Sequence, residues 1–211
     1  MYGEKEIAFL KNKDEKLAYA IDRIGIIERS LHPDLFEALM NSIVGQQIST
    51  KAHITVWNRM KEKFGNITPA RILSLSDDEL QSVGLSYRKV SYMKQSAEHI
   101  LSGAVDLETL HTKSDNEVCE ALCALPGIGV WTAEMLMTFS MRRMDVLSYG
   151  DFAIRKGMRM LYRHRELTPK LFMKYKRRYS PYASVAALYF WAIAGGAMPE
   201  LTDPGSNSKK K

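Results

Sequence analysis

Hydrophobic residues recur every three to four positions along most of the chain, which is the period of a helix with one buried face. Leu17, Ile21 and Ile24 show this spacing between Asp14 and Gly25, and similar stripes follow further along the chain. The alternation that marks strands is nearly absent. The pattern therefore predicts an all-α fold.

Residues that favour helix ends divide this pattern into about ten helices joined by short connections. Ser76 and Ser114 are each followed three residues later by glutamate, which is the spacing of a capping box. The expected helices run from Asp14 to Gly25, from Pro33 past Ile43, from Ser49 to Gly65, from Pro69, from Ser76, from Tyr87 to Gly103, from Ser114 to about Ala124, and over about 130–141, 151–163, 169–179 and 183–195. They form a bundle-like domain over 1–198 without an evident linker, followed by a basic tail over 199–211 that we expect to be disordered.

Composition narrows the class of protein. The 211 residues are 45% hydrophobic, enough for a sizeable core, and no stretch has the length or apolar character of a signal peptide or a membrane span. Cys119 and Cys123 are too few for a disulfide framework or a four-cysteine iron–sulfur cluster, and the five histidines lack zinc-site spacing. We expect a reducing setting, either cytoplasmic or nuclear, and no zinc.

Positive charge is concentrated in the C-terminal third. The net charge is +6, but Lys209, Lys210 and Lys211 supply half of it, so the excess elsewhere is modest. Twelve cationic residues lie between 142 and 178: Arg142, Arg143, Arg155, Lys156, Arg159, Arg163, Arg165, Lys170, Lys174, Lys176, Arg177 and Arg178. Such clustering indicates either a surface for a polyanion or a solvated helix face.

The segment Leu125-Pro126-Gly127-Ile128-Gly129 lies between two predicted helices. Gly127 and Gly129 permit positive φ and leave the backbone accessible, so the amides of the turn and of the next helix could bind one phosphate. Ile128 would anchor the turn in the core. The alternative is an ordinary helix-to-helix turn.

A second informative segment, Leu147-Ser148-Tyr149-Gly150-Asp151, precedes the helix predicted from Phe152. Asp151 is a plausible N-cap of that helix, and a helix N-terminus favours the ionised form of a carboxylate.

Together with Ile43-Val44-Gly45-Gln46-Gln47-Ile48-Ser49, these segments resemble the helix-hairpin-helix DNA glycosylase superfamily, and their order resembles the DNA-3-methyladenine glycosylase II family in a short form without its N-terminal β domain. The resemblance covers about residues 4–197. It implies two intertwined helical lobes with the active-site cleft between them, and a monomer that flips and hydrolyses alkylated bases out of double-stranded DNA in base excision repair.

The resemblance also implies roles for individual residues. Asp151 would be catalytic, and Trp131, Phe152 and Trp191 would line the base pocket. Trp131 stands where strand-nicking relatives carry a Schiff-base lysine, so no lyase activity is expected. Gln47, or Gln46, would fill the gap left by the flipped base, and Gly127, Ile128 and Gly129 would bind the backbone. Carbonyls of Cys123, Leu125 and Ile128 match the positions that hold a sodium or potassium ion.

Other interpretations stay open from the sequence. The two tryptophans could be core residues, and the glutamines could be polar residues at a helix end. The chain could be a hairpin module that holds DNA without catalysis, or a glycosylase for uracil, hypoxanthine or oxidised purines.

Overall fold

In the computed structural model, the described residues are 2–29, 31–32 and 34–205, and they form helices joined by short turns, with no strand among them. The helices are α1 (Glu4–Lys13), α2 (Glu15–Ile24), α3 (Leu35–Gly45), α4 (Thr50–Phe64), α5 (Pro69–Ser74), α6 (Asp77–Gln81), α7 (Tyr87–Leu101), the 3-10 helix η1 (Thr109–Thr112), α8 (Asp115–Cys123), α9 (Val130–Phe139), α10 (Phe152–Tyr162), α11 (Pro169–Tyr179) and α12 (Ala183–Ala194). The predicted all-α class is confirmed. No described helix has the length and apolar character needed to cross a membrane.

Local capping explains where most helices begin. The Ser76 hydroxyl accepts the amide of Glu79 at 3.2 Å, and the Glu79 carboxylate accepts the amide of Ser76 at 2.7 Å. Ser114 and Glu117 repeat this exchange at the start of α8, so both predicted capping boxes are confirmed. The helix expected from Pro33 begins at Leu35 with Asp34 as its cap, and Pro33 itself lies outside the described residues.

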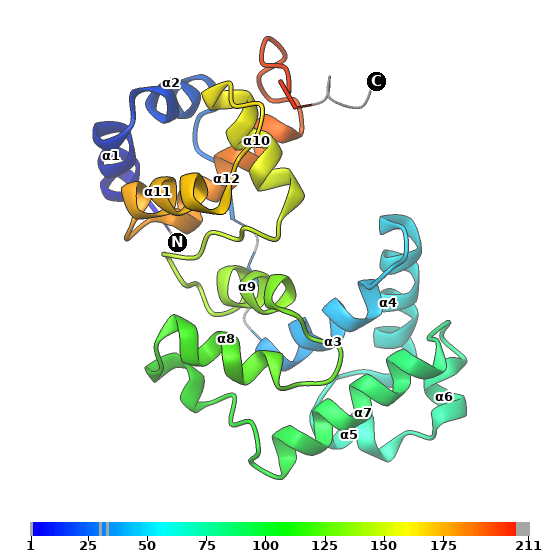
Figure 1. The fold of residues 1–211 in the computed structure, drawn as a ribbon. Helices are drawn as coiled ribbons and strands as arrows, with labels where there is room; N and C mark the ends of the chain where they lie inside the picture. The colour runs from blue at the N-terminus through cyan, green and yellow to red at the C-terminus, as the bar shows by residue number, and fades with distance from the viewer. Residues whose placement is uncertain (1, 30, 33, 206–211) are drawn as a thin grey trace. The chain divides into compact units, whose positions relative to one another are not determined.

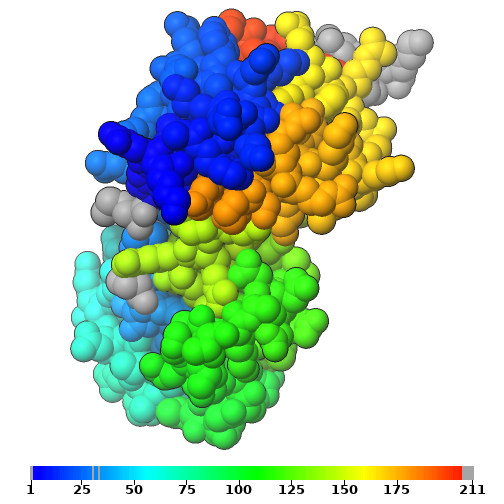
Figure 2. All heavy atoms as spheres, turned by 90° about the vertical axis from the view of Figure 1, so that its left-hand side faces the viewer, coloured from blue at the N-terminus to red at the C-terminus, as the bar shows by residue number. Residues whose placement is uncertain are grey.

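The chain divides into two compact units. Unit 1 combines the described residues of 1–30 and 142–211, and unit 2 those of 31–141 (Figure 1). Unit 1 therefore joins the two ends of the chain. Figure 2 shows the blue N-terminal residues packed beside the orange residues of α11 in this unit.

In unit 1, α10 and α12 are in close contact at Gly157. A β-carbon at Gly157 would lie 2.0 Å from the backbone oxygen of Phe190, so the two backbones touch where they cross. Beyond the crossing, Tyr162, Tyr175 and Tyr179 form a stacked aromatic cluster, and the hydroxyls of Tyr162 and Tyr179 are 2.5 Å apart. The cluster fixes α10 against α11 and α12.

In unit 2, α3 contacts α4, α7 and α9, while α8 packs on α9 and α5 on α7. Leu39, Met40 and Ile43 of α3 are fully buried at the centre of this unit. Helix α1 in unit 1 is not among the helices predicted from the sequence, and its Leu10 is also fully buried.

The segment 199–205 is ordered, contrary to our expectation of a disordered tail from residue 199. The Asp203 carboxylate accepts two hydrogen bonds from the Arg159 guanidinium, and the Gly205 amide donates to Asp203 at 3.0 Å. A bidentate ion pair with both partners largely out of water holds the segment on α10. The part of the predicted tail over 206–211 lies outside the described residues.

Candidate functional site

The turn between α8 and α9, in unit 2, is a tight hairpin. Gly127 has φ +77°, in the left-handed region that favours glycine. The Ile128 amide donates to the Leu125 carbonyl at 3.1 Å, and both side chains are buried. Ile128 thus anchors the turn in the core, as the sequence predicts.

The two hairpin glycines have different surroundings. A β-carbon at Gly127 would lie 2.4 Å from the ring of Tyr92 on α7. The packing of Tyr92 therefore requires glycine at position 127. A β-carbon at Gly129 would meet nothing within 4 Å, and Gly129 has φ −98°, which any residue adopts. Nothing among the described residues requires glycine at position 129.

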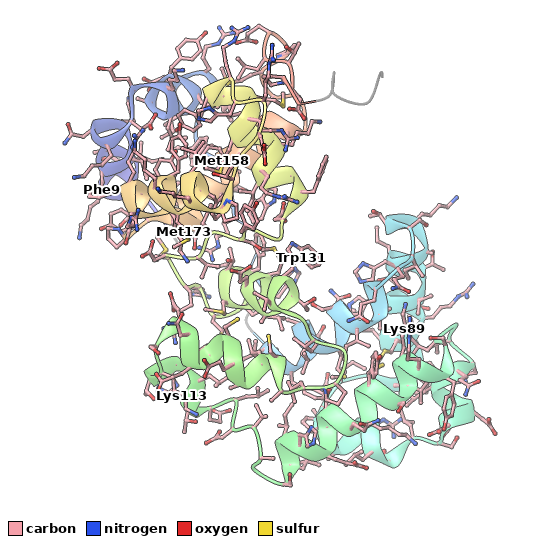
Figure 3. The ribbon with its side chains drawn as sticks, viewed as in Figure 1. Phe9, Lys89, Lys113, Trp131, Met158 and Met173 are labelled. Carbon is pink, nitrogen blue, oxygen red and sulfur yellow. The ribbon has the colours of Figure 1, made fainter. Side chains whose placement is uncertain are left out.

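Helix α9 begins at the hairpin without a side-chain cap. Gly129 is its N-cap and offers no acceptor, whereas Ser114 caps α8 and Asp151 caps α10. The helix N-terminus carries partial positive charge and amides that point out of the helix, an arrangement suited to an anion. Trp131, in this first turn, is 50% exposed and projects from α9 in Figure 3. It is therefore not a core residue.

Gln46 and Gln47 follow α3 and have distinct contacts. The Gln46 amide nitrogen donates to the Gly127 carbonyl at 2.9 Å, so this side chain braces the hairpin. Gln47 is exposed, has φ +56°, and its side-chain oxygen accepts from Arg88 of α7 at 3.1 Å. Of the two candidates for a DNA-inserting residue, Gln47 is the more available, because it is exposed while Gln46 is bound to the hairpin backbone.

Asp151, in unit 1, is the N-cap of α10. Its Oδ1 accepts the amide of Ile154 at 2.8 Å, and the residue is only 7% exposed. The preceding segment is fixed by α12, because the Ser184 hydroxyl donates to the Arg143 carbonyl at 2.8 Å and accepts the Val146 amide at 2.9 Å. A carboxylate is therefore held rigidly where the helix dipole favours negative charge.

Asp145 is the nearest other carboxylate in the sequence, and its oxygens accept hydrogen bonds that hold the start of α12. It accepts the Ser180 hydroxyl at 2.5 Å and the Ala183 amide at 3.4 Å, at the start of α12. These contacts occupy both carboxylate oxygens with helix capping. Asp151 is the better candidate for chemistry.

Two aromatic candidates lie in the same unit as Asp151. Phe152 follows it directly and is 65% exposed, which is unusual for a large apolar side chain in the first turn of a helix. Trp191 is half-buried on α12, the helix that packs on α10. Phe152 and Trp191 therefore lie in one unit, on two helices that contact each other.

Cations on α10 already have partners inside unit 1. The Lys156 ammonium donates to the Ala194 carbonyl at the end of α12, at 2.9 Å. The Arg155 guanidinium lies 5.1 Å from the Tyr149 ring centroid, and Arg159 pairs with Asp203. Arg178 of α11 likewise pairs with Asp14. The cluster of positive charge seen in the sequence is therefore partly used in folding rather than left for a partner.

The carbonyls of Cys123, Leu125 and Ile128 belong to the end of α8 and to the hairpin. Carbonyls in a last helical turn have no intrahelical partner, and hard oxygen ligands suit an alkali ion. The Leu125 carbonyl oxygen also accepts a hydrogen bond from the Ile128 amide, and its second lone pair is left to bind an ion. The donor set fits such an ion in chemical type.

Several contacts at these sites carry no signal in the sequence. Tyr92 and Arg88 are on α7, about forty residues from the segments that they contact, and only tertiary packing brings them there. Asp203 falls in a polar segment whose composition indicated disorder, and its partner Arg159 is one of many cations nearby.

Most of the chain resembles proteins of known activity. Residues 40–181 match the family described as HhH-GPD superfamily base excision DNA repair protein. The chain is 34% identical over 161 residues to DNA-3-methyladenine glycosylase 1 of Schizosaccharomyces pombe, covering 74% of this chain and 71% of that protein.

Solved structures agree with this match. A DNA-3-methyladenine glycosidase from Bacillus halodurans has a TM-score of 0.86 and 36% identity, and the likeness covers 93% of this chain and 92% of that one. The S. pombe 3-methyladenine DNA glycosylase Mag1, in complex with abasic DNA, has a TM-score of 0.77 and 31% identity, covering 90% and 96%.

Proposed function

Because this chain belongs to the HhH-GPD superfamily of base excision DNA repair proteins, we propose that it is a DNA glycosylase that hydrolyses alkylated bases from double-stranded DNA and leaves an abasic site. The observation that carries the proposal is Asp151, a nearly buried carboxylate fixed by the first turn of α10. A module that only holds DNA has no need of such a group.

Asp151 acts on the sugar. When the bond between C1′ and the base nitrogen breaks, positive charge develops on the sugar ring, and a fixed carboxylate stabilises it. Asp151 also orients a water molecule and accepts its proton as the oxygen bonds to C1′. The Ile154 amide keeps the carboxylate in place throughout, so little reorganisation accompanies the reaction.

The substrate class follows from the leaving group. A purine methylated at a ring nitrogen carries positive charge and leaves as a neutral base, so no general acid is needed. Phe152 and Trp191, in the same unit as Asp151, contact the flipped base in this proposal. Contact of a cation with an aromatic face contributes about 0.5–2 kcal/mol, which gives a moderate preference rather than a strict one.

The hairpin and Gln47 position the DNA. The uncapped start of α9 binds one phosphate through its amides, and Gly129 leaves room for the backbone of the nucleic acid. Gln47, exposed and held by Arg88, fills the space left in the stack. An alkali ion on the carbonyls of Cys123, Leu125 and Ile128 would add positive charge beside that phosphate.

Base release from methylated duplex DNA tests the proposal. Asp151→Asn keeps the shape of the side chain and an acceptor for the Ile154 amide but removes the charge, so the release rate should fall by about two to four orders of magnitude. DNA affinity should change little.

Asp145→Asn is the matched control, since it removes a nearby carboxylate that caps α12. It should lower stability by about 1–2 kcal/mol and leave the release rate of the folded protein near that of the wild type. Loss of release in Asp145→Asn with an active Asp151→Asn would reverse the assignment. No release of alkylated bases by the wild type would contradict the proposed substrate class.

A further inference from the structure

Asp203 holds Arg159 in one geometry. Its Oδ1 accepts from Nε at 2.9 Å and its Oδ2 from Nη2 at 2.5 Å, while the Gly205 amide donates to Oδ1 at 3.0 Å. The two side chains are 11% and 14% exposed, so water competes little for the pair. Asp203 lies outside the segment 40–181 that matches the family.

Arg159 in turn lies over Phe152. Its guanidinium carbon is 5.9 Å from the centroid of the Phe152 ring, two helical turns back along α10. Phe152 is largely exposed and directly follows Asp151. The ion pair in the C-terminal segment is therefore connected to an aromatic side chain beside the candidate catalytic carboxylate.

We infer that Asp203 and Arg159 control how strongly the Phe152 ring attracts a cation, and so set how strongly the protein prefers cationic over neutral bases. The inference rests on the proposed function, in which Phe152 contacts the flipped base. Arg159 and Asp203 are positioning residues here, because they act through Phe152 and not on the base.

A cationic base stacked on Phe152 would be the second cation on that ring, after Arg159. A cation is attracted to the negative face of an aromatic ring, and Arg159 already draws on this charge distribution, so a second cation binds Phe152 less strongly. The Arg159 charge also repels a cationic base directly. Asp203 cancels much of that repulsion because its carboxylate is in contact with the guanidinium. A neutral base depends on none of these contributions.

Both charges persist over the working range of pH. The hydrogen bond to Arg159 holds the pKa of Asp203 below its usual value, and the same bond raises the pKa of Arg159. The other cations on this part of α10 are directed elsewhere, Arg155 to the Tyr149 ring and Lys156 to the Ala194 carbonyl. Among the three cations of α10, Arg159 is thus the one that lies over Phe152.

The test compares two substitutions that must act in opposite directions. Single-turnover release is measured on duplexes containing 7-methylguanine, which is cationic, and hypoxanthine, which is neutral. Asp203→Asn leaves Arg159 without its counter-charge, so the ratio of cationic to neutral release should fall by about threefold or more. Arg159→Gln removes the cation from the ring, so the ratio should rise by about two- to fivefold.

Two controls separate an electrostatic effect on Phe152 from disruption of the C-terminal segment. Glu200→Gln removes another carboxylate of the same segment, whose partner Arg23 is 3.9 Å away and exposed, and should leave the ratio unchanged. The double variant Asp203→Asn/Arg159→Gln should resemble Arg159→Gln. Equal ratios in all variants, or a shift of both single variants in the same direction, would overturn the inference.

A binding measurement keeps the inference testable apart from catalysis. N-methylquinolinium is a permanent planar cation, and quinoline is its neutral counterpart. Their relative affinity should follow the same order, lowest for Asp203→Asn and highest for Arg159→Gln, even if the protein releases no alkylated base. Failure of base release would then count against the proposed function, whereas unchanged relative affinity would count against the role of Asp203 and Arg159.

Discussion

Gly127 and Gly129 are present in the hairpin for different physical reasons. Gly127 combines a left-handed backbone with the Tyr92 ring against its α-carbon, so its role is internal. Gly129 has an ordinary backbone and open space where a side chain would be, so no described contact requires glycine there. The proposed phosphate contact would supply the reason for Gly129, whereas the reason for Gly127 is folding.

Alanine substitutions separate the two requirements. Gly127→Ala should destabilise the protein by about 1–3 kcal/mol, because the left-handed backbone is strained and the Tyr92 ring must move. Gly129→Ala should cost only about 0.5–1 kcal/mol as an N-cap change and should weaken DNA binding by about fivefold or more, since the methyl group separates a phosphate from the amides. Thermal unfolding measures the loss of stability, and DNA titration at a fixed salt concentration measures the loss of affinity. Full DNA affinity in a folded Gly129→Ala protein would refute the phosphate site.

Individual roles could be predicted from the sequence where the chemistry is local. Asp151 as an N-cap follows from its position before an apolar helical stripe, and the structure confirms that cap. The bracing of the hairpin by Gln46 could not be foreseen, because its partner is eighty-one residues away and the bond depends on packing. Gln46 and Gln47 are neighbours of identical chemistry, and only the turn after α3 distinguishes them.

Helix α10 depends on a single small residue for its packing. The backbone of Phe190 occupies the place that a β-carbon of Gly157 would take. Since α10 begins with Asp151 and Phe152, this crossing with α12 also determines where those two residues are held.

Gly157→Ala should therefore lower the free energy of unfolding by about 1–3 kcal/mol, because neither backbone can yield without shifting a helix. Chemical denaturation checks this, with Gly129→Ala as the matched control in open space. A Gly157→Ala protein as stable as the control would show that α10 and α12 are not in close contact.

His164, just beyond α10, makes the stability of unit 1 depend on pH. Burial, and secondarily the charge of Lys16, lowers the pKa of His164 below its usual 6.5. The unfolded chain then takes up a proton first as the pH falls through 6.5, so the free energy of unfolding should decrease from that point downward. His164→Gln should reduce this slope in urea denaturation between pH 7.5 and 5. An identical slope in the variant would rule out His164 as the source.

Helices with strong caps and a clear apolar stripe could be predicted closely, and α11 has the predicted bounds of 169–179. Helix α1 was missed because charged residues dominate its sequence and its stability depends on one buried side chain, Leu10, in contact with distant parts of the chain. The segment 199–205 was assigned to disorder for a similar reason. The ion pair of Asp203 with Arg159 on α10 helps to hold it, and composition does not reveal that contact.

At the scale of the molecule, the twelve cationic residues between 142 and 178 overstate the positive charge that this region offers a polyanion. Arg159 and Arg178 are neutralised by Asp203 and Asp14, and Lys156 is bound to the end of α12. We therefore expect specific backbone sites such as the start of α9 to contribute to DNA binding in addition to side-chain charge.

The proposed enzyme should leave an intact abasic site. Trp131 has no amine to attack the sugar, and the Lys156 ammonium is engaged by the Ala194 carbonyl, so water is the nucleophile. Borohydride treatment during turnover on damaged DNA should trap no covalent adduct. An adduct that persists in Trp131→Ala and disappears in Lys156→Ala would show that Lys156 forms a Schiff base.

The composition of unit 1 from both ends of the chain has a consequence for synthesis. A ribosome releases α1 and α2 first, but their partners α10, α11 and α12 follow more than a hundred residues later. Unit 2 is one continuous segment, so all of its helices leave the ribosome before α10 is made. The apolar faces of α1 and α2 stay exposed to chaperones and proteases until α10, α11 and α12 have been synthesised. Slow translation of residues 31–141 should therefore increase proteolysis of α1 and α2 more than proteolysis of the segment being translated.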